Sequence, residues 1–129
     1  CIGKKPDGSP FRVGIREPFA SQGTSIAVAS VSDLSVVTSG VYERCFTEDD
    51  ILYHHLLDPK TGYPFNTGLN AVSIISKASV DGDALSTVCF ALGIEKGMEL
   101  INSMPDVYAV FVTEMNEVVY SDGAENFFR

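Results

Sequence analysis

The segment NAVSIIS (residues 70–76), separated by three residues from VDGDALSTVCFAL (residues 80–92), decides the fold class of this chain. The first segment is rich in β-branched and apolar residues and predicts a strand. The second predicts an amphipathic helix, because apolar residues recur in it at helical spacing. The predicted apolar stripe consists of Ala84, Leu85, Val88, Cys89 and Leu92. Both kinds of secondary structure therefore contribute to the fold.

Local signals mark the ends of this helix. Asp81 or Asp83 places an acid near its N-terminus, where negative charge interacts favourably with the helix dipole. Gly93 is typical of the residue just beyond a helix C-terminus. A second helix is predicted over residues 95–104, and Pro105 ends it because proline cannot continue a helix. We therefore expect two clustered helices.

The rest of the chain predicts strands joined mostly by turns. The predicted strands are residues 11–15, 25–31, 35–39, 41–46, 51–57, 107–113 and 118–121. The segment 58–68 holds two prolines and two glycines, and we expect an ordered loop there because Tyr63 and Phe65 favour burial. Because turns join most strand pairs and the helices lie together, residues 1–129 are predicted to form an α+β fold with a largely antiparallel sheet.

Composition excludes several classes of protein. The chain has 129 residues, of which 45% are hydrophobic and 20% charged, as in an ordinary globular domain. Its net charge of −8 disfavours nucleic acid and anionic lipid as partners, but suits a divalent cation. The longest apolar run, residues 107–112, is too short to span a membrane. Cys1, Cys45 and Cys89 show no zinc or disulfide pattern, and Cys89 is predicted to be inert within the helix.

The first candidate site is the segment from His54 to Pro64, HHLLDPKTGYP, which contains both histidines of the chain. A histidine held between a strand end and a rigid loop suits a general base, because imidazole titrates near neutral pH. Adjacent residues on a strand face opposite ways, so at most one of His54 and His55 faces a given site. The alternative is a histidine at a hairpin edge beside an ordinary Asp-Pro turn.

The second candidate is the pair Asp83 and Thr87, which lie four residues apart on one helical face. A carboxylate and a hydroxyl are hard oxygen ligands, suited to Mg²⁺ or Ca²⁺. Two ligands are not a complete site, so the others must come from backbone carbonyls, water or substrate phosphate. The alternative is an ordinary helix N-terminus with a threonine bonded to its own backbone.

The third candidate is the segment from Thr38 to Arg44, TSGVYER. Small residues at a strand end allow a ligand to approach the backbone, and an arginine can bind a phosphate. For Arg44 itself, a surface position is the favoured interpretation. The chain contains no Gly-x-Gly-x-x-Gly, Walker lysine or Gly-x-Ser-x-Gly motif.

Taken together and in this order, four segments resemble the C-terminal part of the ApbE family, the FAD:protein FMN transferases. They are Val13-Gly14-Ile15-Arg16-Glu17-Pro18, Thr38-Ser39-Gly40-x-Tyr42, His55-x-x-Asp58-Pro59-x-Thr61-Gly62-x-Pro64, and Asp83-Ala84-Leu85-Ser86-Thr87-x-x-x-x-Leu92-Gly93. The histidine and aspartate motifs are specific in combination. This chain departs from the family at Gly82, where Ala is common, and at Val41, where a polar or acidic residue is common.

The resemblance implies a reaction and assigns residues to it. FMN is transferred from FAD to a Thr or Ser hydroxyl of an acceptor protein, AMP leaves, and Mg²⁺ binds the pyrophosphate. Asp83 and Thr87 match the metal ligands. His55 matches the histidine that takes the proton from the acceptor hydroxyl, and the backbone of Leu57 matches the position that lies against the flavin. These roles agree with the hypotheses of a hard-metal pair and an orientable histidine.

The resemblance also implies that residues 1–129 are the C-terminal portion of a transferase domain, because family members are much longer and their N-terminal half supplies much of the FAD pocket. We therefore expect the isolated chain to fold, to bind FAD weakly, to be inactive alone, and to self-associate through uncovered apolar surface. Bacterial members are generally exported, which implies a periplasmic location or a membrane-anchored lipoprotein for the parent protein.

Two other functions stay open. One is a protein that binds FAD, or hydrolyses it to FMN and AMP, without transfer to an acceptor. The other is a structural or interaction domain. The presence of His55 together with Asp83 and Thr87 favours the transferase, since a protein that only binds flavin needs no base at that place.

Overall fold

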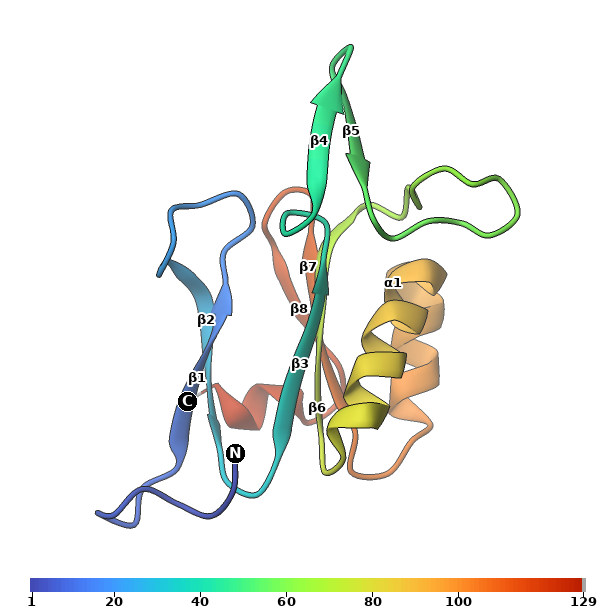
Figure 1. The fold of residues 1–129 in the computed structure, drawn as a ribbon. Helices are drawn as coiled ribbons and strands as arrows, with labels where there is room; N and C mark the ends of the chain where they lie inside the picture. The colour runs from blue at the N-terminus through green and yellow to red at the C-terminus, as the bar shows by residue number, and fades with distance from the viewer. Residues whose placement is uncertain (129) are drawn as a thin grey trace.

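A central antiparallel sheet carries a helix on one face and a β-hairpin on the other (Figure 1). The structure is a computed structural model and describes residues 1–128. The helical layer is α1 (Ser79–Asn102), and the hairpin on the opposite side joins β1 (Phe11–Arg16) to β2 (Ser25–Val31). The short 3-10 helix η1 (Ala124–Phe127) packs beside β2. The predicted α+β class with a largely antiparallel sheet is confirmed.

The central sheet has the order β3-β6-β7-β8, and all its pairs are antiparallel. These strands are β3 (Ser35–Gly40), β6 (Leu69–Ser76), β7 (Tyr108–Thr113) and β8 (Val118–Tyr120). Every residue of β6 is buried, because the strand is covered on both faces. The main core lies between this sheet and α1, and includes Val72, Ile74, Phe90 and Phe111. Because α1 packs against the sheet, the fold determines which residues of α1 face the sheet and which face solvent.

The helical run α1 is interrupted at Gly93, so it consists of two helical segments in succession. Gly93 has φ 77° and ψ 178°, a backbone conformation that residues with a side chain rarely adopt. The predicted end of the first helix at Gly93 and the two clustered helices agree with this geometry. No helix within residues 1–128 is long and apolar enough to cross a membrane.

The predicted apolar stripe of the helix was wrong in part. Cys89 is fully buried and Leu85 packs against the core, but Ala84 is exposed, and Val88 and Leu92 are 44% and 41% exposed. The face that contacts the sheet instead contains the small residues Gly82 and Ser86. A Cβ atom at Gly82 would lie 2.9 Å from Cγ2 of Val37, so the close approach of α1 to β3 excludes large side chains there.

The hairpin of β4 (Cys45–Glu48) and β5 (Ile51–His54) projects from one end of the sheet (Figure 1). It is shorter than the predicted strands 41–46 and 51–57, because the chain leaves the hairpin after His54 and folds into a loop. Leu57 pairs with Pro64 across this loop, and the Gly62 N–H donates to the Asp58 carbonyl at 2.8 Å. The loop is ordered as predicted. Phe65 packs on the core, but Tyr63 is 66% exposed, contrary to expectation.

Candidate active site

The two adjacent histidines at the end of β5 face different environments, as the strand geometry predicts. His54 is 9% exposed and its ring packs edge-on against Phe90, with ring centroids 5.8 Å apart. His55 is exposed, and its main-chain N–H donates to the Arg44 carbonyl at 3.2 Å. His55 is therefore the histidine whose side chain is accessible to a substrate.

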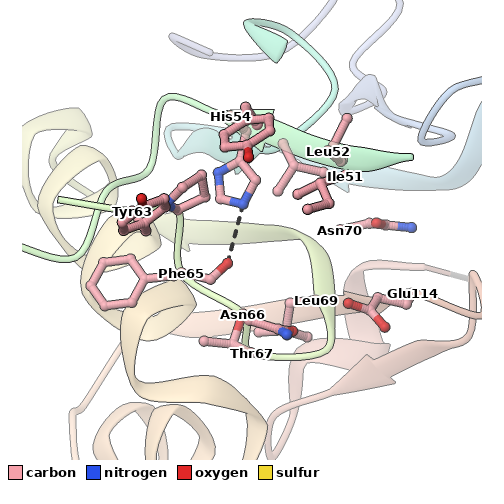
Figure 2. Close-up of a pocket in the computed structure, with 13 residues that line it drawn as sticks. Ile51, Leu52, His54, Tyr63, Phe65, Asn66, Thr67, Leu69, Asn70 and Glu114 are labelled. Carbon is pink, nitrogen blue, oxygen red and sulfur yellow. Dashed lines mark hydrogen bonds between the residues drawn. The ribbon is translucent and has the colours of Figure 1, made fainter. Parts of the chain in front are cut away.

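The hydrogen bonds of His54 hold the loop that follows it. The His54 Nε2 atom lies 3.2 Å from the Phe65 carbonyl oxygen (Figure 2). The Leu56 N–H donates to Nδ1 at 3.3 Å. Since Nδ1 accepts, Nε2 carries the proton and donates to Phe65, which defines one neutral tautomer. Burial lowers the pKa of His54, and this favours the same neutral form.

His54 also forms part of the wall of a cavity of about 420 Å³ on that side of the hairpin (Figure 2). Its other walls come from β5, from the loop around Phe65 and from the start of β6. Figure 2 shows Asn66, Thr67 and Glu114 on its polar side, facing Ile51 and Leu52. His55 does not line this cavity, so the two histidines serve different parts of the structure.

A second cavity brings together three of the four residues singled out in the sequence. It has a volume of about 410 Å³ and lies where the end of β3 meets the first turns of α1 and the segment after β5. His55, Asp83 and Thr87 all line it, although 28 residues separate the first two in the chain. The complete lining is Thr38, Ser39, Gly40, Glu43, Arg44, His55, Leu56, Asp83 and Thr87.

Leu57, the fourth predicted residue, lies in an adjoining cavity of about 500 Å³. This cavity is mostly apolar, with Phe46 and Tyr63 among its walls. Arg44 and His55 line both this cavity and the polar one that holds Asp83 and Thr87. A ligand with one apolar end and one phosphate end could therefore extend across both, with His55 at the junction.

Arg44 is exposed, so the surface position favoured from the sequence is confirmed. It also lines both the polar and the apolar cavity, which the sequence did not predict. Among the residues that line the polar cavity, Arg44 carries a permanent positive charge. The sequence analysis included Arg44 in its third candidate segment, but the place of Arg44 beside both cavities depends on the turn between β3 and β4.

That turn is held by contacts from the β1–β2 hairpin. Arg16 forms an ion pair with Glu43 at 2.8 Å, and its guanidinium lies over the Tyr42 ring, 5.3 Å from the centroid. Burial, together with the Glu43 charge, raises the pKa of Tyr42, so the phenol stays protonated near neutral pH. Gly40 is required beside this ring, because a Cβ atom there would lie 2.7 Å from the Tyr42 Cε1 atom.

The donor atoms around the polar cavity fit a hard divalent cation. Asp83 offers a carboxylate and Thr87 a hydroxyl, and no cysteine lines this cavity. Within the described residues, the Asp83 carboxylate makes no hydrogen bond or ion pair, so its oxygens are available. No group of three or more His, Cys, Asp or Glu side chains that could hold a metal occurs in residues 1–128. Phosphate oxygens, water or further backbone groups would complete the coordination.

Cys89 takes no part in this chemistry. It is fully buried on the inner face of α1, and burial raises the pKa of its thiol to about 11. A thiol in that state is a poor nucleophile at neutral pH. All three cysteines are free, and Cys1 and Cys45 are exposed.

Comparison with known proteins assigns the chain to a family. A sequence model described as the ApbE family matches residues 1–111. This chain belongs to the ApbE family. Among curated ApbE relatives, the FAD:protein FMN transferase of Treponema pallidum is 46% identical over 113 residues, which are 88% of this chain and 31% of the relative. The corresponding Klebsiella pneumoniae protein is 41% identical over 111 residues, 86% of this chain and 35% of the relative.

Solved ApbE structures share the fold. The ApbE protein of Thermotoga maritima matches with a TM-score of 0.84 and 32% identity, over 98% of this chain and 41% of that one. The flavinyl transferase ApbE of Pseudomonas stutzeri, in its apo form, matches with a TM-score of 0.73 and 34% identity, over 98% of this chain and 40% of that one. The chain thus spans about a third of the length of the curated relatives it matches.

Proposed function

We propose that this chain supplies the C-terminal part of a flavin transferase, which moves FMN from FAD to a Thr or Ser hydroxyl of an acceptor protein and releases AMP. The observation that carries the proposal is the polar cavity, where His55, Arg44, Asp83 and Thr87 meet although they come from three separate segments. Curated relatives of this chain are named FAD:protein FMN transferases, which supports the same reaction. The proposal includes an N-terminal part that completes the flavin pocket.

In this reaction His55 acts as the general base. The acceptor hydroxyl oxygen forms a bond to the phosphorus of the FMN phosphate, and the phosphorus–oxygen bond to AMP breaks. His55 takes the proton of the acceptor hydroxyl, and AMP leaves with the electron pair of the broken bond. The exposed position of His55, beside both the polar and the apolar cavity, lets an acceptor side chain reach it.

Arg44 and the pair Asp83 and Thr87 bind the charged part of FAD. The Arg44 guanidinium donates paired hydrogen bonds to phosphate oxygens. Asp83 and Thr87 are the residues that would hold Mg²⁺, through a carboxylate and a hydroxyl oxygen. When bound there, Mg²⁺ stabilises negative charge on the transferred phosphoryl group and the leaving AMP. Leu57 contributes its backbone to the flavin side, in the adjoining apolar cavity.

Transfer is tested in the full-length protein that carries this chain. FAD, Mg²⁺ and an acceptor protein are mixed, and flavin bound covalently to the acceptor is measured together with released AMP. The His55→Ala variant should lose a factor of about 10²–10⁴ in transfer rate, the usual contribution of a general base, with FAD binding retained. Lys60→Ala is the matched control, because Lys60 is exposed on the loop after His55 and lines none of the three cavities.

The same assay separates the alternatives. AMP release without flavin on any acceptor would identify an FAD hydrolase. FAD binding without AMP release would identify a flavin-binding protein. Equal activity of wild type and His55→Ala would remove His55 from the reaction.

The isolated chain of 129 residues should bind FAD weakly and transfer no FMN, because two protein ligands hold Mg²⁺ poorly without the rest of the site. Calorimetric titration of FAD with Mg²⁺ present measures this. Tight binding would show that the pocket is already complete in this chain, and would refute the need for an N-terminal part. Sedimentation of the same sample tests whether the chain self-associates through the exposed Val80, Val88 and Leu92.

A further inference from the structure

Three hydroxyl groups form a continuous chain beneath the polar cavity. The Ser39 Oγ atom, at the end of β3, lies 2.8 Å from Ser86 Oγ and 3.1 Å from Thr87 Oγ1 on α1. The Ser86 Oγ atom also lies 3.0 Å from the main-chain oxygen of Asp83. Ser39 and Thr87 line the cavity, whereas Ser86 is fully buried. This series of hydrogen-bonded hydroxyl groups therefore runs from the cavity wall into the contact between α1 and β3.

The direction of each hydrogen bond in this chain follows from proton counting. A carbonyl oxygen only accepts, so Ser86 donates its single hydroxyl proton to the Asp83 carbonyl. The bond between Ser86 and Ser39 must then use the Ser39 proton, with Ser86 accepting. Ser39 has no second proton, so Thr87 donates to Ser39 in the remaining bond. The three hydroxyl groups thus donate in one direction, from Thr87 to Ser39, from Ser39 to Ser86, and from Ser86 to the Asp83 carbonyl.

The consequence falls on the Thr87 oxygen. With its proton directed at Ser39, Thr87 Oγ1 presents only lone pairs to the cavity that it shares with the Asp83 carboxylate. A cation ligand must present lone pairs, because a hydroxyl proton directed at the cation is repelled. We propose that Ser39, a residue with no assigned role, is a positioning residue that fixes Thr87 in its cation-binding orientation, with Ser86 setting the direction of the bonds. This inference rests on the metal site of the proposed function.

Without Ser39, Thr87 has an alternative partner. A helical threonine commonly donates to the carbonyl four residues earlier, which for Thr87 is that of Asp83. Rotation of the Thr87 side chain toward that carbonyl would change the position of its oxygen relative to the Asp83 carboxylate. Ser39 opposes this rotation because its Oγ atom accepts the Thr87 proton, and the Asp83 carbonyl already accepts the proton of Ser86.

The test measures Mg²⁺ binding directly, in the full-length protein saturated with FAD, by calorimetry. Ser39→Ala should raise the Kd for Mg²⁺ by about 10-fold, as is usual when a partner that orients a metal ligand is removed. Ser39→Thr, which keeps the hydroxyl, should restore most of the affinity. Ser86→Ala should also weaken Mg²⁺ binding, because Ser39 would lose its acceptor and could then donate to Thr87. FAD affinity without Mg²⁺ should change little in all three variants.

Ser35→Ala is the matched control. Ser35 lies on the same strand and face as Ser39, and its hydroxyl bonds Ser76 in a similar way, with 3.1 Å between the Oγ atoms and 3.0 Å to the Ser76 carbonyl. It does not line the polar cavity, so its variant should bind Mg²⁺ as the wild type does. Thermal unfolding of each variant accompanies the titration. If Ser39→Ala does not fold, Ser86→Ala and Ser39→Thr decide the question by the same measurement.

Thr87→Ala separates failure of this inference from failure of the metal site. If Thr87→Ala weakens Mg²⁺ binding and folded Ser39→Ala does not, the positioning role is refuted and the metal site stands. If Thr87→Ala has no effect, the metal assignment itself is wrong. In the double variant Ser39→Ala/Thr87→Ala, the loss should be no greater than in Thr87→Ala alone, because Ser39 acts through Thr87.

Discussion

The ring of His54 joins two points of the chain eleven residues apart, since its Nε2 atom lies 3.2 Å from the main-chain oxygen of Phe65. The same ring accepts the Leu56 N–H through Nδ1. Both contacts hold the loop that begins immediately after His55. His54 therefore supports the loop beside the site through its hydrogen bonds, although it does not line the polar cavity.

Replacing His54 by Ala should lower the free energy of unfolding by about 1–3 kcal/mol, because the Phe65 carbonyl and the Leu56 N–H lose their partner in a buried setting. Urea denaturation of the 129-residue chain measures this. His55→Ala is the control and should stay within about 0.5 kcal/mol of wild type, because His55 is exposed. Similar losses in both variants would contradict the structural role assigned to His54.

The stability of the chain should depend on pH through His54. Burial is the main cause that lowers its pKa below the usual 6.5, so the folded state binds a proton less readily than the unfolded state. This group should therefore leave stability unchanged above pH 6.5, and reduce it as the pH falls from there toward the lowered pKa. Denaturation curves at a series of pH values test this. The His54→Gln variant should lack this fall in stability below pH 6.5. Identical pH profiles for the variant and the wild type would refute the role of His54.

Asp83 and Asp81 should differ in function although they are two residues apart on α1. In the full-length protein, Asp83→Ala should abolish Mg²⁺-dependent transfer, because its carboxylate lines the polar cavity. Its stability should stay within about 0.5 kcal/mol of wild type, because Asp83 is exposed and lies beyond the first turn of α1. Asp81→Ala is the control, since Asp81 lies in the first turn but outside the cavity, and it should retain activity. Full Mg²⁺-dependent transfer by folded Asp83→Ala would remove Asp83 from the site.

Gly82→Ala should destabilise the chain. The new Cβ would lie 2.9 Å from Cγ2 and 3.2 Å from Cβ of Val37, which is stiff and belongs to β3. Overpacking of this kind costs about 1–3 kcal/mol, which exceeds the gain of up to about 1 kcal/mol from better helix propensity. A Val37→Ala background removes the Cγ2 contact but keeps the 3.2 Å contact to the Cβ atom of residue 37, so the same change should cost less there. Denaturation of the four proteins measures the coupling, and additive effects would contradict the contact.

Much of the fold was predictable from local patterns. The β-branched segment of β6 and the end of the first helix at Gly93 agree with the structure, because strand and helix signals act over a few residues. The opposite orientation of His54 and His55 also follows from strand geometry alone. The four motifs identified the family, and they contain several of the residues that line the polar cavity, among them His55, Asp83 and Thr87.

Periodicity could not show which face of α1 contacts the sheet. Spacing groups Ala84, Val88 and Leu92 on one side of the helix, but the side that packs is determined by the shape of β3, which admits Gly82 and Ser86 and excludes larger residues. The buried side of α1 includes the apolar Cys89 and Phe90, and the close approach of the helix to β3 adds the small Gly82 and Ser86 to that side.

The cavity, too, was decided by tertiary structure. The sequence by itself determined that His55, Asp83 and Thr87 are residues of the types that phosphoryl transfer needs. Only the fold placed them with Arg44 and Ser39, because the end of β3, the turn before β4 and the start of α1 meet through contacts between distant segments. Local sequence signals do not encode the distance between such segments, which depends on how the helix and the hairpin pack against the sheet.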